Sequence, residues 1–314
     1  MTHVLSRPLP HRADRPFLTD GGLETWLIFH KGIALRAFAA FELIENADGR
    51  AVLREYFEPF LQTAAAAGMG FVLDTPTWRA SPDWGRELGY DRDRLAALHR
   101  AAVDFLVALR AAQPNAVDVL INGVIGPRGD GYDAGHIMSV PEAEAYHRFQ
   151  IDQFAHSRAD MVSAITMTNV SEAVGIVRAA READIPAVIS FTVETDGRLP
   201  SGQPLGAAIE EVDRRTMAAP AYYMVNCAHP DHFSDMLQPG APWLGRIRGV
   251  RANASRQSHA ELDAAESLDA GDPVELGTLY GRLARALPGL AVAGGCCGTD
   301  HRHVQQMCAV LRDA

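Results

Sequence analysis

The amino-acid sequence predicts an α/β protein with the fold of a (β/α)8 TIM barrel, built as a single domain over residues 1–314. Eight short apolar segments alternate along the chain with longer amphipathic ones. The short segments are apolar and often β-branched, which is typical of strands buried on both faces of a parallel sheet. Eight such strand and helix units occupy roughly 250–300 residues. No linker rich in Pro, Gly or Ser divides the chain, and a doubly wound open sheet, the alternative, rarely needs eight strands.

Apolar runs predict the strands in order. They cover 16–22, 71–75, 119–125, 161–167, 187–193, 222–227, 246–254 and 290–296. The first run ends in the turn-forming pair Gly21 and Gly22, and the run at 246–254 is the weakest of the eight. The stretches 26–50 and 196–206 are expected to be loop insertions at the mouth of the barrel.

Amphipathic segments between these runs predict the helices. The segment 93–113 places Leu95, Leu98 and Ala102 at helical spacing. The segment 141–159 opens with proline, as helices often do. The remaining helices are expected over 53–68, 170–184, 205–218 and 273–287, with a short helix from Pro230 and a last one that starts near Thr299 or Asp300.

Composition and charge narrow the class of partner. The formal net charge of −10 disfavours nucleic acid and anionic membrane surfaces, since both repel an acidic protein. No apolar run reaches the roughly 18 residues of a membrane helix, and the first residues lack the apolar core of a signal peptide. We therefore expect a cytoplasmic protein. In that reducing compartment the four cysteines are expected to be metal ligands, reactive thiols or core residues, and not disulfides.

Polar residues and cysteines gather where the predicted strands end, which is where barrels of this kind carry their chemistry. The ends of these strands hold Asp20, Gly21, Gly22, Asp74, Thr75, Gly126, Asn226, Cys227, Asn253, Cys296 and Cys297. Three of the four cysteines thus lie on one rim. Three thiolates that converge from two strand ends suit a soft, tetrahedral ion, and Zn²⁺ is the first choice.

The vicinal pair Cys296 and Cys297 lies between glycines, in "AGGCCG". Adjacent residues in a regular strand point to opposite faces, so both thiols reach one ion only if the backbone leaves the extended conformation. Flanking glycines allow that turn at low steric cost. Two small buried residues at a strand end are the alternative interpretation. The fourth cysteine, Cys308, falls on the apolar side of the last helix and is expected in the core.

With these positions in place, the chain resembles the homocysteine S-methyltransferase family, whose members are zinc-dependent enzymes on a (β/α)8 barrel. The resemblance covers almost the whole chain. It rests on "TDGGLET" at 19–25, "GFVLDTPTWRAS" at 70–81, "VIGPRGDGY" at 124–132, "SFTVETDGRLPSGQPL" at 190–205, "VNCAHP" at 225–230 and "AGGCCGTDHRHV" at 293–304. The last two segments together form the zinc signature of the family.

The resemblance implies Zn²⁺ as cofactor, held by Cys227, Cys296 and Cys297, with a fourth position open for a substrate thiol. It implies an enzyme of the EC 2.1.1 class that moves a methyl group from a small sulfonium or betaine donor to a thiol acceptor. Homocysteine, which would give methionine in methionine biosynthesis, is the first choice of acceptor. We expect no second domain to hold folate or cobalamin, which favours S-methylmethionine, S-adenosylmethionine or a betaine as donor.

The same pattern gives the expected substrate contacts. Asp20, Gly21 and Gly22 would line the acceptor site, and Glu24 near the mouth could contact a cationic ligand. Hydrogen bonds from the rim would orient the ligands, and an aromatic ring would cradle the cationic methyl centre. The residues assigned to these two tasks are Thr75, Asn226 and Asn253 for the hydrogen bonds, and Trp78, with Trp26 behind it, for the ring.

The chain departs from the family where the amino acid is recognised. Members usually carry a glutamate near the end of strand four that holds the substrate ammonium, and Ile165 stands at that place. One branch has a tyrosine where this chain has Arg79. Another acid, Glu24 or Glu194, would then hold the ammonium, or the acceptor would not be homocysteine. Two other functions stay open: a zinc barrel with a structural or sensing role, and a hydrolase or lyase that uses zinc-bound water. The sequence is compatible with a homo-oligomer.

Overall fold

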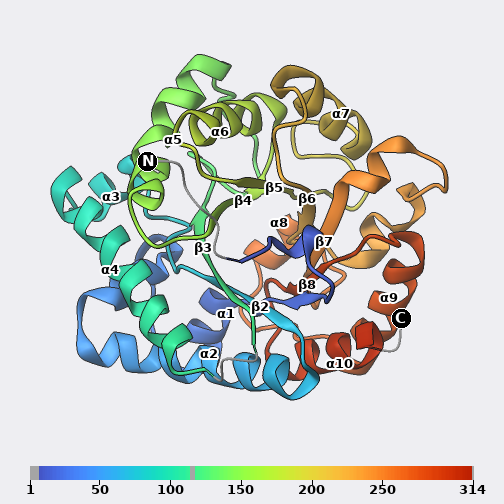
Figure 1. Cartoon of the computed structure of the whole chain (residues 1–314), viewed down its shortest axis with the longest axis horizontal. Helices are drawn as coiled ribbons and strands as arrows, with labels where there is room; N and C mark the ends of the chain where they lie inside the picture. The colour runs from blue at the N-terminus through green and yellow to red at the C-terminus, as the bar shows by residue number, and fades with distance from the viewer. Residues whose placement is uncertain (1–6, 114–116, 313–314) are drawn as a thin grey trace.

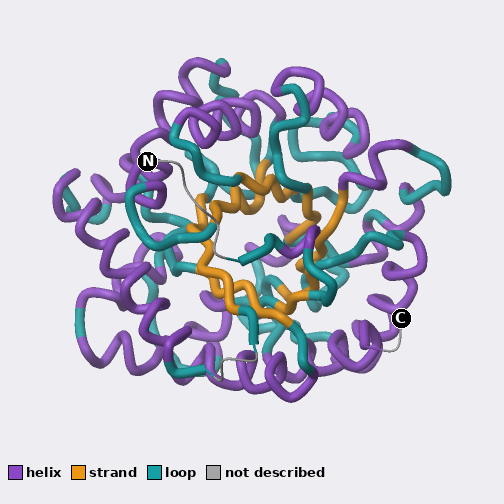
Figure 2. Tube along the Cα trace, in the orientation of Figure 1, coloured by secondary structure: helices purple, strands orange, loops and turns teal. Residues whose placement is uncertain are grey.

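The computed structural model describes residues 7–113 and 117–312. Eight parallel strands close into a barrel in the order β1 to β8, and helices surround it, as predicted (Figure 1). The ring of strands lies inside the helical layer (Figure 2). The strands are β1 (Phe17–Leu18), β2 (Gly70–Asp74), β3 (Val119–Ile125), β4 (Met161–Met167), β5 (Ala187–Phe191), β6 (Tyr223–Asn226), β7 (Ile247–Ala252) and β8 (Val292–Gly295).

The helices follow the predicted segments, with three additions. They are α1 (Leu23–Phe29), α2 (Ala47–Ala67), α3 (Pro82–Glu87), α4 (Arg92–Ala111), α5 (Val140–Ala155), α6 (Val170–Glu182), α7 (Leu205–Thr216), α8 (His259–Asp263), α9 (Pro273–Ala286) and α10 (His301–Arg312). The sequence did not predict α1, α3 and α8, which are short and lie in the connections that follow strands. In the part of the chain that is described, no helix combines the length and the apolar character needed to cross a membrane.

The first strand is shorter than the run at 16–22 predicted, because the chain turns away after Leu18. Two backbone bonds still tie the following residues to β8: Thr19 N donates to Ala293 O at 2.9 Å, and Gly295 N donates to Asp20 O at 2.8 Å. The next residues then begin α1, so the stretch 26–50, expected as loop, starts within a helix and continues through the 3-10 segments η2 (Arg36–Phe38) and η3 (Ala40–Glu45).

Apolar side chains fill the interior of the barrel at the end where the strands begin. Leu9, Phe17, Val72, Leu120 and Met224 belong to this inner cluster, and each is almost fully buried. A larger apolar cluster lies between the strands and the helices, and it contains Cys308 of α10, as predicted. The inner cluster closes one end, and the hollow of the barrel opens where the strands end, which is where the polar residues gather.

Candidate metal centre and substrate pocket

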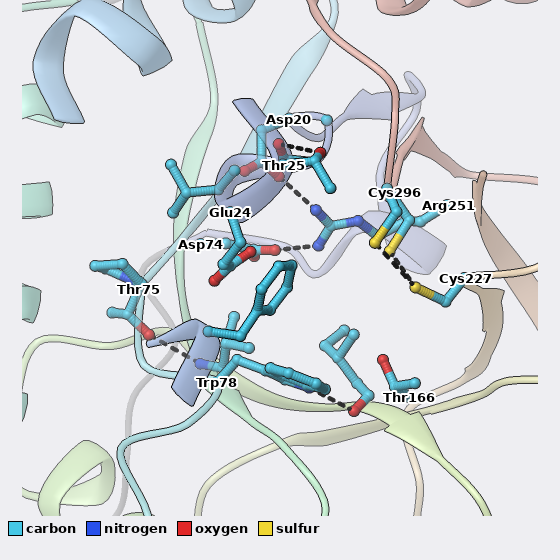
Figure 3. Close-up of a pocket in the computed structure, with 18 of the residues that line it drawn as sticks. Asp20, Glu24, Thr25, Asp74, Thr75, Trp78, Thr166, Cys227, Arg251 and Cys296 are labelled. Carbon is cyan, nitrogen blue, oxygen red and sulfur yellow. Dashed lines mark hydrogen bonds and ion pairs between the residues drawn. The ribbon is translucent and has the colours of Figure 1, made fainter. Parts of the chain in front are cut away.

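A pocket of about 650 Å³, counting the part open to solvent, lies at the carboxyl ends of the strands. That size suits a small-molecule ligand. Its lining residues lie on or just after β1, β2, β3, β4, β6, β7 and β8, so the pocket is central to the barrel (Figure 3). Nine of the eleven residues expected to touch substrate or metal line this pocket: Asp20, Gly21, Gly22, Glu24, Thr75, Trp78, Cys227, Cys296 and Cys297.

Three thiols meet on one wall of the pocket. Cys227 follows β6, and Cys296 and Cys297 follow β8, so the cluster joins segments that lie 69 and 70 residues apart. The Sγ atom of Cys227 lies 2.8 Å from that of Cys296 and 3.8 Å from that of Cys297. All three sulfur atoms lie within 4.8 Å of one another. In a tetrahedral zinc site with Zn–S bonds of 2.3 Å, neighbouring sulfurs stand about 3.8 Å apart.

The backbone of Cys227 takes a left-handed conformation, with φ of 54°, which is uncommon for a residue other than glycine. Neighbouring groups hold it there. Its carbonyl oxygen accepts hydrogen bonds from Asn253 Nδ2 at 3.1 Å and from the His259 ring at 2.6 Å, while its N–H donates to Arg251 O. A left-handed conformation costs roughly 1–2 kcal/mol and persists where its surroundings fix it. These bonds therefore turn the thiol of Cys227 toward β8.

The glycines around the vicinal pair serve close packing more than rotation. A Cβ on Gly294 would lie 1.9 Å from Thr19 Oγ1, and one on Gly295 would lie 1.8 Å from Thr299 Oγ1. Of the three flanking glycines only Gly298 has a left-handed backbone, with φ of 78°. The sequence argument that all three glycines supply conformational freedom was thus correct for one of them. The other two let the β1 and α10 connections approach β8.

A buried ion-pair cluster supports the floor of the pocket. The Arg251 guanidinium, on β7, pairs with Asp20 at 2.5 Å and also with Asp74 (Figure 3). Tyr56 donates a hydrogen bond to Asp20 and Asn122 donates one to Asp74. Burial alone would lower the pKa of Arg251, but the two carboxylates raise that pKa above its usual value. The carboxylate of Asp20 is therefore occupied by protein partners.

Glu24 lies at the start of α1 and contributes to the lining of the same pocket. Among the described residues its carboxylate has no ion pair and no hydrogen bond from another side chain. Burial raises the pKa of this carboxyl to about 7. Ile165 contributes an apolar side chain to the same lining. Glu194, the other acid considered, binds the His259 ring at 3.0 Å and does not line the pocket.

The remaining predicted contacts fall into two groups. Thr75 and Trp78 line the pocket; Thr75 Oγ1 accepts from Val124 N at 2.9 Å, and Trp78 Nε1 donates to Ile165 O at 3.1 Å. Asn226 and Asn253 lie behind the pocket wall. Asn226 Oδ1 accepts from Thr166 N at 2.9 Å, so it fixes the wall rather than facing the hollow.

Sequence reasoning missed three residues that shape the site: Arg251, Tyr132 and His259. The Tyr132 hydroxyl lies 3.3 Å from Cys227 Sγ and 3.7 Å from Cys297 Sγ. Its ring stacks on that of His259, with centroids 4.2 Å apart. The one available signal was the presence of arginines in a predicted strand, in "RIRGVRANA" at 246–254. Tyr132 and His259 lie in the long connections that follow β3 and β7, where no periodic pattern singles them out.

The fold and the rim together define a (β/α)8-barrel protein with a three-cysteine candidate metal centre in its mouth. Comparison with known proteins gives the family: the profile described as "Homocysteine S-methyltransferase" matches residues 17–311. The chain therefore belongs to the homocysteine S-methyltransferase family.

Curated relatives agree with this assignment, and solved structures share the fold. The chain is 24% identical over 202 residues to homocysteine S-methyltransferase YbgG of Bacillus subtilis and 26% identical over 200 residues to homocysteine S-methyltransferase of Escherichia coli. Each match covers 62% of the relative, and 62% and 60% of this chain, respectively. The oxidized form of the homocysteine methyltransferase MmuM from Escherichia coli superposes with a TM-score of 0.73 at 22% identity, over 96% of this chain and 97% of MmuM. Its metallated form gives 0.72 at 21% identity, over 96% and 99%.

Proposed function

We propose that the protein is a zinc-dependent S-methyltransferase that moves a methyl group from a small sulfonium or betaine donor to a thiol acceptor, with homocysteine as the acceptor. The observation that carries the proposal is the cluster of Cys227, Cys296 and Cys297 on the wall of a central pocket. Membership of the homocysteine S-methyltransferase family supports it. The chain matches 62% of the length of its curated relatives, so their activity is carried over here as a proposal.

The donor set fits zinc. Three sulfur atoms within 4.8 Å of one another offer the soft ligands that zinc prefers, and one of the distances already equals the edge of a zinc–sulfur tetrahedron. Hydrogen bonds from Cys227 and Cys297, together with the Arg251 charge, hold the pKa of the Cys296 thiol well below its usual value. When bound, zinc would polarise a substrate thiol so that it ionises at neutral pH.

The chain's own residues would hold and orient the acceptor. We propose that Glu24 takes the acceptor ammonium, because it is the carboxylate of the lining that lacks a protein partner among the described residues, whereas Asp20 and Asp74 are paired with Arg251. Glu24 and Ile165 both line the pocket, so the acid would act from the β1 end of the barrel where this chain has no acid at the β4 end. Gly21 and Gly22, just before it, let the chain pack closely on the β8 end, since a Cβ would lie 2.6 Å from Thr299 O and 2.7 Å from Cys296 O, respectively.

A direct assay tests the proposal. The purified, zinc-loaded protein is incubated with homocysteine and, in turn, S-methylmethionine, S-adenosylmethionine and glycine betaine, and products are identified by mass spectrometry with metal content measured in parallel. We expect one zinc per chain and methionine from at least one donor. Stoichiometric zinc without methylation of any thiol would instead support a structural or sensing role. Turnover of a substrate without an added thiol would support a hydrolase or lyase.

A further inference from the structure

Two titratable side chains beside the thiol cluster have no role in the proposed function. His259, at the start of α8, is 6% exposed, and Glu194 follows β5. The His259 ring lies between two groups: Nε2 lies 2.6 Å from the carbonyl oxygen of Cys227, and Nδ1 lies 3.0 Å from Glu194 Oε1. The ring therefore links the connection after β7 to the connections after β5 and β6.

The backbone on one side of the ring fixes which nitrogen donates. A carbonyl oxygen only accepts hydrogen bonds, so Nε2 of His259 carries a hydrogen and donates it to Cys227 O. Asn253 Nδ2 donates to the same oxygen at 3.1 Å. Two side-chain donors thus orient the peptide group that follows Cys227, whose φ of 54° lies in the left-handed region. A residue other than glycine keeps that conformation where its surroundings hold it.

Further contacts fix the place of the ring itself. Ser258 and Glu261 form a capping box at the start of α8, and this sets the position of His259 as the first helical residue. One face of the ring stacks on Tyr132, with centroids 4.2 Å apart, and the Tyr132 hydroxyl lies 3.3 Å from Cys227 Sγ. A ring held at both nitrogens and on one face has little freedom to turn. The conformation of Cys227 is thus supported from outside the thiol cluster.

The connection that carries His259 also lines a second cavity. This outer chamber encloses about 1080 Å³, again counting the part open to solvent. Leu262 and Asp263 line it from α8, and Arg79 lines it from the connection after β2. His259 lines neither this chamber nor the inner pocket that holds the thiols. Any effect of His259 on the site therefore passes through the residues that it holds.

We propose that His259, held by Glu194, is a positioning residue for the metal centre, because its hydrogen bond to Cys227 O turns that thiol toward the β8 pair. This inference rests on the zinc site of the proposed function and deepens it. Groups that hold metal ligands in place typically contribute about ten- to a hundredfold to metal affinity or activity. The same carboxylate and imidazole would otherwise be candidates for substrate contact, yet neither of them lines the pocket.

The donor atom distinguishes this role from simple packing. The amide nitrogen of a glutamine reaches about as far from the backbone as Nε2 of a histidine, whereas that of an asparagine reaches only as far as Nδ1. H259Q therefore keeps a donor for Cys227 O, and H259N loses it. Both variants lose the stacking on Tyr132, so a difference between them reports the donor. His232 gives a matched control, because its Nε2 lies 2.9 Å from Arg256 O, a backbone carbonyl outside the metal centre.

Zinc binding tests the inference without turnover. Zinc dissociation constants of the wild type, H259Q, H259N and H232N are measured by competition with a chromophoric chelator. Absorption spectra of the cobalt-substituted proteins report the geometry of the sulfur ligands. We expect H259N to bind zinc at least about tenfold more weakly than the wild type, with a shifted cobalt spectrum. H259Q should stay within about threefold of the wild type because it restores the hydrogen bond, and H232N should match the wild type.

Other outcomes overturn the inference. It is wrong if the wild type binds no zinc or if H259N binds zinc as the wild type does. It is also wrong if H259Q and H259N lose affinity equally, since that result assigns the ring a packing role. Should H259N fold poorly, E194A replaces it, because the ring then keeps its donor and loses its second support. We expect E194A to bind zinc several-fold more weakly, and an unchanged affinity would count against the pair.

The result is separable from that of the methylation assay. Weaker zinc binding by H259N alone, with no methylation of any thiol by the wild type, would leave the inference standing while the proposed methyl transfer fails. Methylation of homocysteine by the wild type, together with unchanged zinc affinity of H259N, would show the reverse.

Discussion

Two buried arginines at the mouth of the barrel have opposite surroundings. Arg251, in the inner pocket, is 7% exposed and forms ion pairs with Asp20 and Asp74. Arg79, in the outer chamber, is 8% exposed and lies between two indole rings without a carboxylate partner among the described residues. The exposure of the two side chains is nearly equal, so burial alone does not separate them. What differs is whether the protein itself supplies the opposite charge.

That difference distinguishes a supporting group from a group that awaits a ligand. A buried ion pair whose partners are all protein groups holds segments together, and removing one partner leaves a charge stranded. A buried cation stacked on aromatic rings keeps most of its hydrogen-bonding capacity. In the inner pocket the same contrast separates Asp20, which is paired, from Glu24, which is not. The comparison thus predicts which substitutions damage the fold and which damage ligand binding.

Substitution of a thiol should have the largest effect on function. We expect Cys297→Ala to lose the bound zinc and to lower the rate of methyl transfer at least about a thousandfold, because metal activation supplies several kcal/mol of transition-state stabilisation. Metal analysis of the purified protein and the product assay measure both losses. Cys308→Ala is the control, since Cys308 packs against Met69 in the core, 3.8 Å from its sulfur. Full turnover by zinc-free Cys297→Ala would refute the ligand assignment.

The two arginines should differ most in the stability of the protein. Arg251→Gln leaves Asp20 and Asp74 buried without their cation, and we expect the free energy of unfolding to fall by about 3–5 kcal/mol. Arg79→Gln loses its cation–π contacts with two indole rings and one hydrogen bond, so about 1–2 kcal/mol is expected. Urea denaturation of both variants, followed by circular dichroism, measures the difference. Equal destabilisation would show that Arg79 has a structural role like that of Arg251.

The sequence predicted the scaffold well because each element carries its own local signal. The segments 119–125 and 161–167 matched β3 and β4 at both ends, since continuous apolar runs define buried parallel strands. The meeting of Cys227 with Cys296 followed from topology, because all strand ends of a parallel barrel share one rim. Short helices such as α1 were missed because Gly21 and Gly22 in "DGGLET" indicate a turn rather than a helix start.

The ion pairs within the site could not be predicted from the sequence, for a physical reason. Arg251 finds its two carboxylates 231 and 177 residues earlier in the chain, and no local pattern records such a contact. Whether a strand residue faces the barrel axis or the helices is likewise not visible in a run that is buried on both faces. The unpaired state of Arg79 and Glu24 is a property of three-dimensional neighbours alone. The hypotheses about these two residues therefore rest on which charged side chains have a partner of opposite charge in the folded structure.

Within the inner pocket, the unpaired acid Glu24 should affect acceptors with an amino group more than acceptors without one. We expect Glu24→Gln to raise the KM for homocysteine roughly tenfold to a hundredfold, the range for one hydrogen bond between charged groups. The KM for 4-mercaptobutanoate, which has no amino group, should stay within about twofold. Steady-state kinetics with both thiols measure the ratio. The double variant E24A/I165E, which moves the acid to the β4 end of the pocket, should recover part of the preference for homocysteine. An equal rise in KM for both thiols would assign Glu24 a structural role instead.

The smallest expected effect concerns pH. Burial raises the pKa of Glu24 to about 7, so the carboxyl is mostly protonated at pH 6 and mostly ionised at pH 7.5. Only the ionised form pairs with an ammonium group, so preference for homocysteine should increase as pH rises through this range. The expected measure is the ratio of kcat/KM for homocysteine to that for 4-mercaptobutanoate, which should rise several-fold, following the ionised fraction. Both acceptors share the titration of the thiol and of the metal centre, so the ratio removes those contributions. In Glu24→Gln the ratio should stay flat, and a slope that persists in that variant would move the titrating group away from Glu24.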